Sequence, residues 1–220
     1  QFWLSLKPRS PNRTNSHPPH PPVAPVDPAR TMDQFLAASR GAWLTRRAVH
    51  HLDHQDDEFG DSNLVIEPFS AEDPAVEQIC LALNINPHLA AGGARFWWES
   101  NLKPLARTED QAAVLIDIPL AGDPSQGFLV RDKGYVEKQP VLSQYTFSSD
   151  GVMTVTTRYD SNVGTERCWF VTDQVRMRVS SVQCLDGVTM TTYCTELRCP
   201  SDATLQSLRE SADSLAAGFS

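Results

Sequence analysis

The sequence predicts a mainly β protein: an antiparallel meander of about ten short strands that closes into a barrel, with one or two flanking helices. Short apolar segments recur almost without interruption from residue 94 to residue 197. Turn-forming sequences, such as Asp150-Gly151 and Asp186-Gly187, separate these segments. A meander of this length usually closes on itself, because closure removes the exposed edge strands. Barrels of about eight to ten strands can hold one small ligand inside.

Residues 1–31 are predicted to be a disordered tail, followed by one folded domain over residues 32–220. Prolines recur through the tail among Ser, Asn and His residues. Such a segment cannot form a regular helix or sheet and cannot bury enough apolar surface to fold. Its basic, acid-poor start is typical of a transit-peptide remnant, and a plain extension is the equally weighted alternative.

The domain is predicted to open with a helix at residues 33–39, a strand at 41–52, an acidic hairpin loop at 53–61 and a strand at 63–69. The strongest helix signal covers residues 70–83. Ser70 and Asp73 resemble a capping box, and Pro74 falls in the first turn, where its missing N–H is harmless. The apolar residues that follow form one stripe at helical spacing: Val76, Ile79, Cys80 and Leu83.

The remaining strands are separated by turns rich in Gly, Asp and Pro. They are predicted at residues 94–100, 112–118, 127–132, 135–147 (interrupted at Pro140), 152–159, 165–171, 175–182 and 188–197. A last, weakly amphipathic helix is predicted at residues 202–217.

Composition and spacing exclude several kinds of function. The chain of 220 residues carries a net charge of −8, which argues against nucleic acid as a partner, because phosphate binding needs a basic field. No apolar run reaches about eighteen residues, so no membrane span is predicted. Five cysteines without CxxC spacing indicate reduced, buried thiols. His50 and His51 are adjacent on a predicted strand and point to opposite faces, so no metal site is predicted.

The hairpin at residues 165–182 carries the most unusual pattern. Arg176, Arg178 and Ser180 share one face of its second strand, because alternate strand residues point to the same side. Glu166 and Trp169 on the first strand add a carboxylate and an aromatic plane. Two interpretations are equally supported: one wall of a pocket for an anionic, planar ligand, or an Arg/Glu ladder on an exposed sheet face.

The sequence Gly41-Ala42-Trp43 at the start of the first strand resembles the lipocalin-type closure, in which the Trp packs across the closed end of the barrel. A late arginine commonly stacks on this Trp, and Arg198 is the candidate. Trp97 and Trp98 alternate, so one of them faces inward, where it is either a core residue or part of an aromatic ligand wall.

Five ordered segments resemble the S-type phycobiliprotein lyases, the CpcS/CpeS family. The resemblance covers residues 35–199. The matching segments are residues 41–52 (GAWLTRRAVHHL), Gly92-Gly93-Ala94-Arg95 with Trp98, residues 127–138 (GFLVRDKGYVEK), Glu166 to Phe170 with Arg176 to Ser180, and Thr195 to Arg198. Thr45, Cys168 and the segment at residues 101–107 depart from the family pattern.

This resemblance implies a ten-stranded, lipocalin-like antiparallel barrel with lyase activity. Its members bind a free linear tetrapyrrole, phycoerythrobilin being one candidate, and promote its thioether attachment to a cysteine of an apo-phycobiliprotein subunit. The bilin is the substrate, so no permanently bound cofactor is expected. A homodimer is compatible with the family. The implied location is the plastid stroma or, alternatively, the cyanobacterial cytoplasm.

The resemblance also implies roles for individual residues. Arg176 and Arg178 would each hold a bilin propionate, and Glu166, the candidate catalytic residue, would accept pyrrole N–H bonds and control protonation. The ring systems would pack on Trp98 or Trp169, and the remaining implied ligand-binding residues are Ser180 and Arg47. From the residues alone, a non-catalytic carrier of another hydrophobic carboxylic acid is the alternative function.

Overall fold

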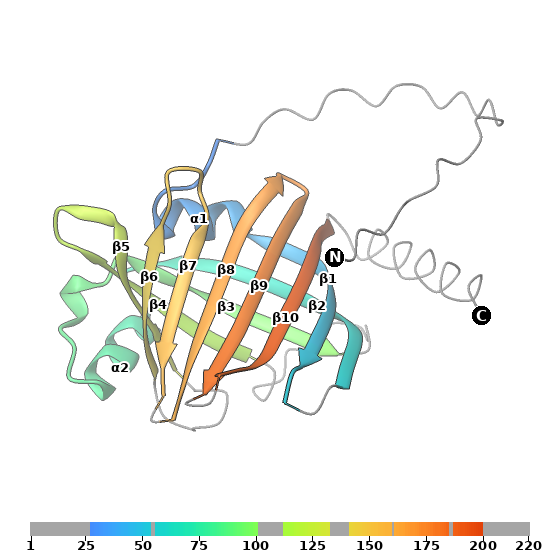
Figure 1. The fold of residues 1–220 in the computed structure, drawn as a ribbon. Helices are drawn as coiled ribbons and strands as arrows, with labels where there is room; N and C mark the ends of the chain where they lie inside the picture. The colour runs from blue at the N-terminus through green and yellow to red at the C-terminus, as the bar shows by residue number, and fades with distance from the viewer. Residues whose placement is uncertain are drawn as a thin grey trace, which may run out of the picture.

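The computed structural model describes residues 27–53, 56–100, 112–132, 141–159, 161–184 and 187–199. These residues form ten strands in one closed antiparallel barrel, in the order β1-β10-β9-β8-β7-β6-β5-β4-β3-β2 (Figure 1). Every strand pairs with its neighbours along the chain, and β1 and β10 close the ring. The predicted ten-stranded antiparallel barrel with flanking helices is confirmed.

The observed strands follow the predicted ones closely along most of the chain. They are β1 (Gly41–His51), β2 (Asp56–Ser70), β3 (Gly92–Ser100), β4 (Ala112–Leu120), β5 (Asp123–Arg131), β6 (Val141–Phe147), β7 (Met153–Arg158), β8 (Asn162–Thr172), β9 (Val175–Cys184) and β10 (Gly187–Cys199). The helical elements are α1 (Met32–Ser39), α2 (Pro74–Ala82) and the 3-10 turn η1 (Pro87–Leu89). The helix predicted at residues 202–217 lies outside the described residues.

The acidic segment predicted as a hairpin loop at residues 53–61 was assigned wrongly, because β2 begins within it. Two cross-strand contacts pair it with β1: His50 Nδ1 lies 2.7 Å from Asp57 Oδ1, and His51 Nε2 lies 3.0 Å from Glu58 Oε1. Hydrogen bonds between imidazoles and carboxylates across the strand pair stabilise a ladder that acidic residues alone would disfavour.

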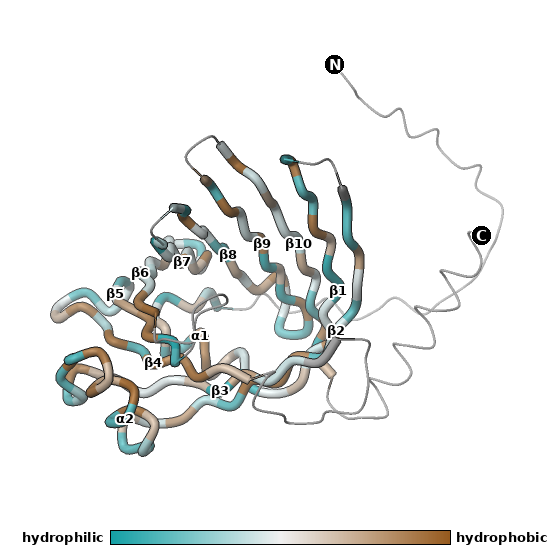
Figure 2. Tube along the Cα trace, turned by 90° about the horizontal axis from the view of Figure 1, so that it is seen from below, coloured by the Kyte–Doolittle hydropathy of each residue, from teal (hydrophilic) through white to brown (hydrophobic). Residues whose placement is uncertain are grey.

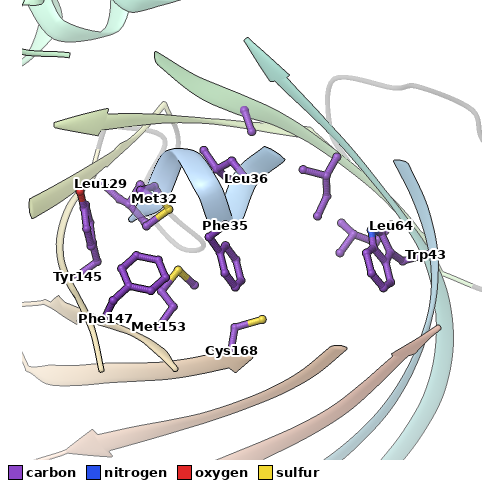
Figure 3. Packing of buried hydrophobic residues seen from close by; sticks show 12 residues of the cluster. Met32, Phe35, Leu36, Trp43, Leu64, Leu129, Tyr145, Phe147, Met153 and Cys168 are labelled. Carbon is purple, nitrogen blue, oxygen red and sulfur yellow. The ribbon is translucent and has the colours of Figure 1, made fainter. Parts of the chain in front are cut away.

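Helix α1 lies inside one end of the barrel and fills it (Figures 2 and 3). Thr31 caps the helix, its Oγ1 accepting a bond from the Gln34 N–H at 3.3 Å. Phe35 is 4% exposed, and its ring centroid lies 5.8 Å from that of Phe147 and 5.4 Å from that of Phe170. We call this end of the barrel the plugged end.

Part of the predicted tail belongs to the folded unit. Ala29 packs against the same interior cluster as α1. Pro28 lies so close to Gly151 that a Cβ atom at Gly151 would be 2.6 Å from the Pro28 Cβ. The remainder of the predicted tail, residues 1–26, lies outside the described residues.

Helix α2 packs on the outside of the barrel, against β4 and β5 (Figure 2). Its first turn is fixed by Asp73, which accepts a bond from the Ala75 N–H at 2.9 Å and pairs with Arg95 on β3 at 2.7 Å. The predicted apolar stripe is confirmed, since three of its residues are buried against the outer faces of the strands: Val76, Ile79 and Cys80. The interior is therefore left to α1 and to the strand residues that point inward.

Candidate functional site

Alternation along β8 and β9 determines which side chains face the barrel interior. Cys168 belongs to the interior cluster, so Glu166, two residues earlier on the same strand, also faces inward. The strand register pairs Glu166 with Ser180 and Cys168 with Arg178, and Arg176 shares the face of Arg178. Both predicted arginines and Ser180 therefore point into the barrel.

Trp169 does not belong to this interior site. It lies between Cys168 and Phe170, which both contribute to the interior cluster, and so it points to the outer face of β8, opposite Met177 on β9. The prediction that Trp169 packs on an interior ligand is therefore wrong. Its odd spacing from Glu166 already places the two side chains on opposite faces of the strand.

The side chain of Arg176 is buried and pairs with other residues of the protein. Its side chain is 4% exposed, its Nε donates to Glu196 Oε2 at 2.6 Å and its Nη1 donates to Ser39 Oγ at 2.8 Å. Its guanidinium also lies 4.9 Å from the centroid of the Trp43 ring. The predicted role of Arg176 in holding a ligand carboxylate is therefore wrong. Arg176 instead ties the end of α1 to the barrel wall.

Glu196 is the buried counter-ion beneath the site. Its side chain is fully buried, and its Oε1 accepts bonds from Arg178 Nε at 3.2 Å and from Thr45 Oγ1 at 3.4 Å. Burial would raise the pKa of Glu196, but Arg176 and Arg178 outweigh it and hold the pKa below its usual range. Sequence reasoning missed this residue, because its partners are revealed only by the pairing of β9 with β10.

Glu166 and Arg178 form a second ion pair next to the buried one. Arg178 Nη1 lies 3.3 Å from Glu166 Oε2, and the two side chains are 29% and 33% exposed. Because both point inward and remain accessible, the interior is open to solvent here. We call this part of the barrel the open half. The alternative predicted from the sequence, an Arg/Glu ladder on an exposed sheet face, is wrong in its location, because these pairs lie on the inner face of the barrel.

Two more arginines face the open half. Arg131 shares the inward face of Leu129 on β5, and its guanidinium lies 5.8 Å from the centroid of the Trp98 ring. Arg47 lies on the inner face of β1 opposite Cys194, is exposed, and forms no ion pair with the described residues. Sequence reasoning missed Arg131, because its approach to Trp98 depends on the register of β3, β4 and β5.

The interior cysteines are poor nucleophiles. Burial raises the pKa of Cys168 to about 12 and also raises the pKa of Cys194. Thiols react as thiolates, so both groups are protonated and inert at neutral pH. All five cysteines of the chain are free.

The plugged end shows the lipocalin-type closure predicted from the sequence. The Arg198 guanidinium stacks 4.2 Å from the Trp43 ring centroid. It also donates to the backbone carbonyls of Ala38 and Arg40, each at 2.6 Å, and of Asp173 at 2.9 Å. Among the described residues, α1, Trp43 and Arg198 therefore fill this end of the barrel.

Within the described residues, no group of three or more His, Cys, Asp or Glu side chains is placed to hold a metal ion. In the same part of the chain, none of the helices is long and apolar enough to cross a membrane.

These features define a small barrel filled by a helix at one end, with a carboxylate, arginines and an indole ring on the inner wall of its open half. The chain belongs to the CpeS-like protein family, whose model matches residues 31–199. The chain is 60% identical over 190 residues to the chromophore lyase CpcS/CpeS of Synechococcus sp. (strain WH8020), covering 86% of this chain and 95% of that protein.

Two further relatives agree with this assignment. The chromophore lyase CpcS/CpeS 4 of Trichodesmium erythraeum (strain IMS101) is 42% identical over 78% of this chain and 89% of its own length. Among solved structures, the S-type phycobiliprotein lyase CPES from Guillardia theta superimposes with a TM-score of 0.63 at 26% identity. That match covers 78% of this chain and 94% of the Guillardia chain.

Proposed function

We propose that this protein is a bilin lyase that binds a free linear tetrapyrrole in the open half of its barrel. It then delivers the bilin to a cysteine of an apo-phycobiliprotein subunit. The observation that supports this most is the partly exposed Glu166–Arg178 pair on the inner wall, since it offers one acceptor and one cation to the same ligand. The relatives named as chromophore lyases support the same function.

Five side chains of the open half each match a part of a linear tetrapyrrole. The Glu166 carboxylate can accept pyrrole N–H bonds, and the Ser180 hydroxyl lies directly across the strand pair from it. Arg178 and Arg47 can each hold a propionate, in place of the buried Arg176. Trp98, with Arg131 beside it, offers an aromatic face for a pyrrole ring.

The chemical step needs no nucleophile from this protein. The acceptor thiolate adds to a carbon of the exocyclic C=C bond of the bilin, one S–C bond forms, and a proton is taken up at the neighbouring position. No electrons are exchanged, so no redox partner is required. The lyase holds the bilin in one conformation and supplies protonation control through Glu166. Because Cys168 and Cys194 are protonated, they do not compete for the bilin.

The proposed partners are therefore the tetrapyrrole and an apo-phycobiliprotein subunit. The relatives compared above come from cyanobacteria and from Guillardia theta. A plastid stroma or a cyanobacterial cytoplasm is the location consistent with such partners, and we propose the plastid.

A variant of Glu166 tests this function directly. Wild-type protein mixed with phycoerythrobilin should give a sharpened, red-shifted visible band and should transfer the bilin to isolated apo-α or apo-β subunits. Glu166→Gln should still bind the bilin, with an altered band, and should transfer it at least about tenfold more slowly. Glu77→Gln changes an exposed carboxylate on α2 and serves as the matched control.

Two results would contradict the proposal. An unchanged bilin spectrum in the presence of wild-type protein would favour a carrier of another hydrophobic acid. Wild-type transfer kinetics in Glu166→Gln would exclude Glu166 from protonation control.

A further inference from the structure

The outer face of β7–β10 is a broad sheet surface that the described helices leave uncovered. Helix α1 lies inside the barrel, and α2 packs against β4 and β5. Figure 1 shows no described helix across the outer side of β8, β9 and β10. This face runs the length of the strands, from the plugged end to the open half.

The composition of this face is that of an interface. Its centre is formed by six residues that adjoin through the register of β7 to β10: Thr154, Arg167, Trp169, Met177, Val179 and Tyr193. Trp169 lies opposite Met177, and Arg167 lies between Thr154 and Val179. Tyr193 is 46% exposed and Arg167 is exposed. Trp, Tyr, Met and Arg are the residue types enriched in protein interfaces and their energetic centres.

Charge on this face differs from charge elsewhere on the barrel. Among the described strand residues of β7–β10, the charged side chains at outward-facing positions are Arg158 and Arg167, and none is a carboxylate. The outer face of β1 and β2, in contrast, carries cross-strand pairs of opposite sign, such as Arg46 with Asp61 at 3.3 Å. Solvated sheet faces commonly carry such pairs. The outer face of β1 and β2 therefore has the paired charges of a solvated surface, whereas the described strand residues on the outer face of β7–β10 lack acidic side chains.

We propose that the outer face of β7–β10 is the surface on which the acceptor apo-phycobiliprotein subunit docks. This inference rests on the proposed function, which requires such a subunit to approach the open half. The subunit would present an apolar surface that packs on Trp169, Met177 and Tyr193. It would also present a carboxylate that meets Arg167.

A second copy of this chain fits the face less well. In a two-fold contact the same patch meets itself, so the arginines of one copy would face those of the other. The described strand residues of this face include no outward carboxylate to separate these like charges, and their juxtaposition is costly at an interface. A carboxylate that pairs with Arg167 on docking is therefore better supplied by a different surface, and the acceptor subunit is the partner that the reaction supplies.

The test compares Arg167→Glu with Arg46→Glu, which makes the same charge change on the neighbouring outer face. Binding of bilin-free lyase to purified apo-α and apo-β subunits is measured by titration calorimetry. Phycoerythrobilin binding is measured separately by absorbance. Arg167→Glu should weaken binding of the accepted subunit at least about tenfold. Its bilin spectrum and bilin affinity should stay within about twofold of wild type, and Arg46→Glu should match wild type in both assays.

Wild-type subunit affinity in Arg167→Glu, or no measurable binding of either subunit to the wild-type lyase, would overturn the docking surface while leaving the bilin assay intact. Sedimentation of both proteins distinguishes a second copy: a wild-type dimer that Arg167→Glu converts to a monomer would overturn the proposal. A large drop in the melting temperature of isolated Arg167→Glu would also overturn it, because the face would then be covered by the chain itself. If the proposed function itself is wrong, the wild-type protein should instead fail to bind phycoerythrobilin.

Discussion

Asp117 places a titratable group in the interior next to the plug. It is 4% exposed and accepts a bond from the Tyr145 hydroxyl at 2.8 Å. Burial raises the pKa of Asp117 to about 6, above the value of about 3.9 expected in the unfolded chain. The folded state therefore binds more protons between these two values, so this group's contribution to stability falls as pH rises from about 4 to about 6.

Asp117→Asn should remove this pH dependence while keeping an oxygen for Tyr145. The substitution changes the free energy of unfolding by an amount that depends on pH. This change should be about 2–3 kcal/mol more favourable at pH 7 than at pH 4. Urea unfolding of both proteins at the two pH values measures the difference. If the substitution changed the free energy of unfolding equally at pH 4 and pH 7, ionisation of Asp117 would not destabilise the folded protein.

At the same scale, the faces of residues were predictable from the sequence and their depth was not. Alternation places Arg176 and Arg178 on one face, and it also excludes Trp169 from the face of Glu166. It cannot tell that Arg176 lies deep enough to meet Glu196 and Ser39, whereas Arg178 stays accessible. Glu196 is 20 positions and Ser39 is 137 positions away from Arg176 in the sequence, so no local pattern indicates these partners.

Among the elements, α1 depends on a residue from the last strand. Arg198 donates to the carbonyls of Ala38 and Arg40 at the C-terminal end of the helix, where backbone acceptors lack partners within the helix. Its guanidinium also covers Trp43. Arg198→Ala should therefore destabilise the protein by about 2–3 kcal/mol, because it removes charged hydrogen bonds and a stacked cation together.

Hydrogen exchange can localise this effect to the plug. Amides of α1 should exchange faster in Arg198→Ala at low denaturant, whereas amides of α2, on the outside of the barrel, serve as an internal control. Equal acceleration in both helices would mean that Arg198 supports the barrel as a whole and not α1.

The elements themselves were largely predictable, because strand alternation and turn residues are local signals. The apolar stripe of α2 and Pro74 in its first turn were likewise visible in the sequence. The capping box predicted at Ser70 was wrong, because Asp73 itself is the cap and the helix begins at Pro74. The β2 boundary was not visible in the sequence, since its acidic start is stabilised by histidines of β1. Nor does a helix of eight or nine residues reveal whether it packs inside a barrel, as α1 does, or outside, as α2 does.

At the scale of the whole molecule, the barrel separates its buried plug from its accessible inner wall along its length. The plugged end holds α1, Trp43, Arg176 and Arg198 in buried contacts. The open half holds the accessible Glu166–Arg178 pair. Changes at the plugged end should therefore alter stability with little effect on the bilin spectrum. The boundary of the folded domain offers a way to test this separation.

We propose that the functional domain begins between residues 27 and 31, and two truncations bracket this boundary. Removal of residues 1–26 should leave the melting temperature unchanged. Removal of residues 1–31 also deletes Ala29, which packs on the core, and Thr31, whose Oγ1 caps α1. The loss of a cap costs about 1 kcal/mol, which should lower the melting temperature of a domain of this size by about 2–4 °C. Both truncated proteins should retain the wild-type phycoerythrobilin band, because Glu166 and Arg178 lie in the other half of the barrel. A changed band in the shorter protein, or a lowered melting temperature after removal of residues 1–26 alone, would contradict this division.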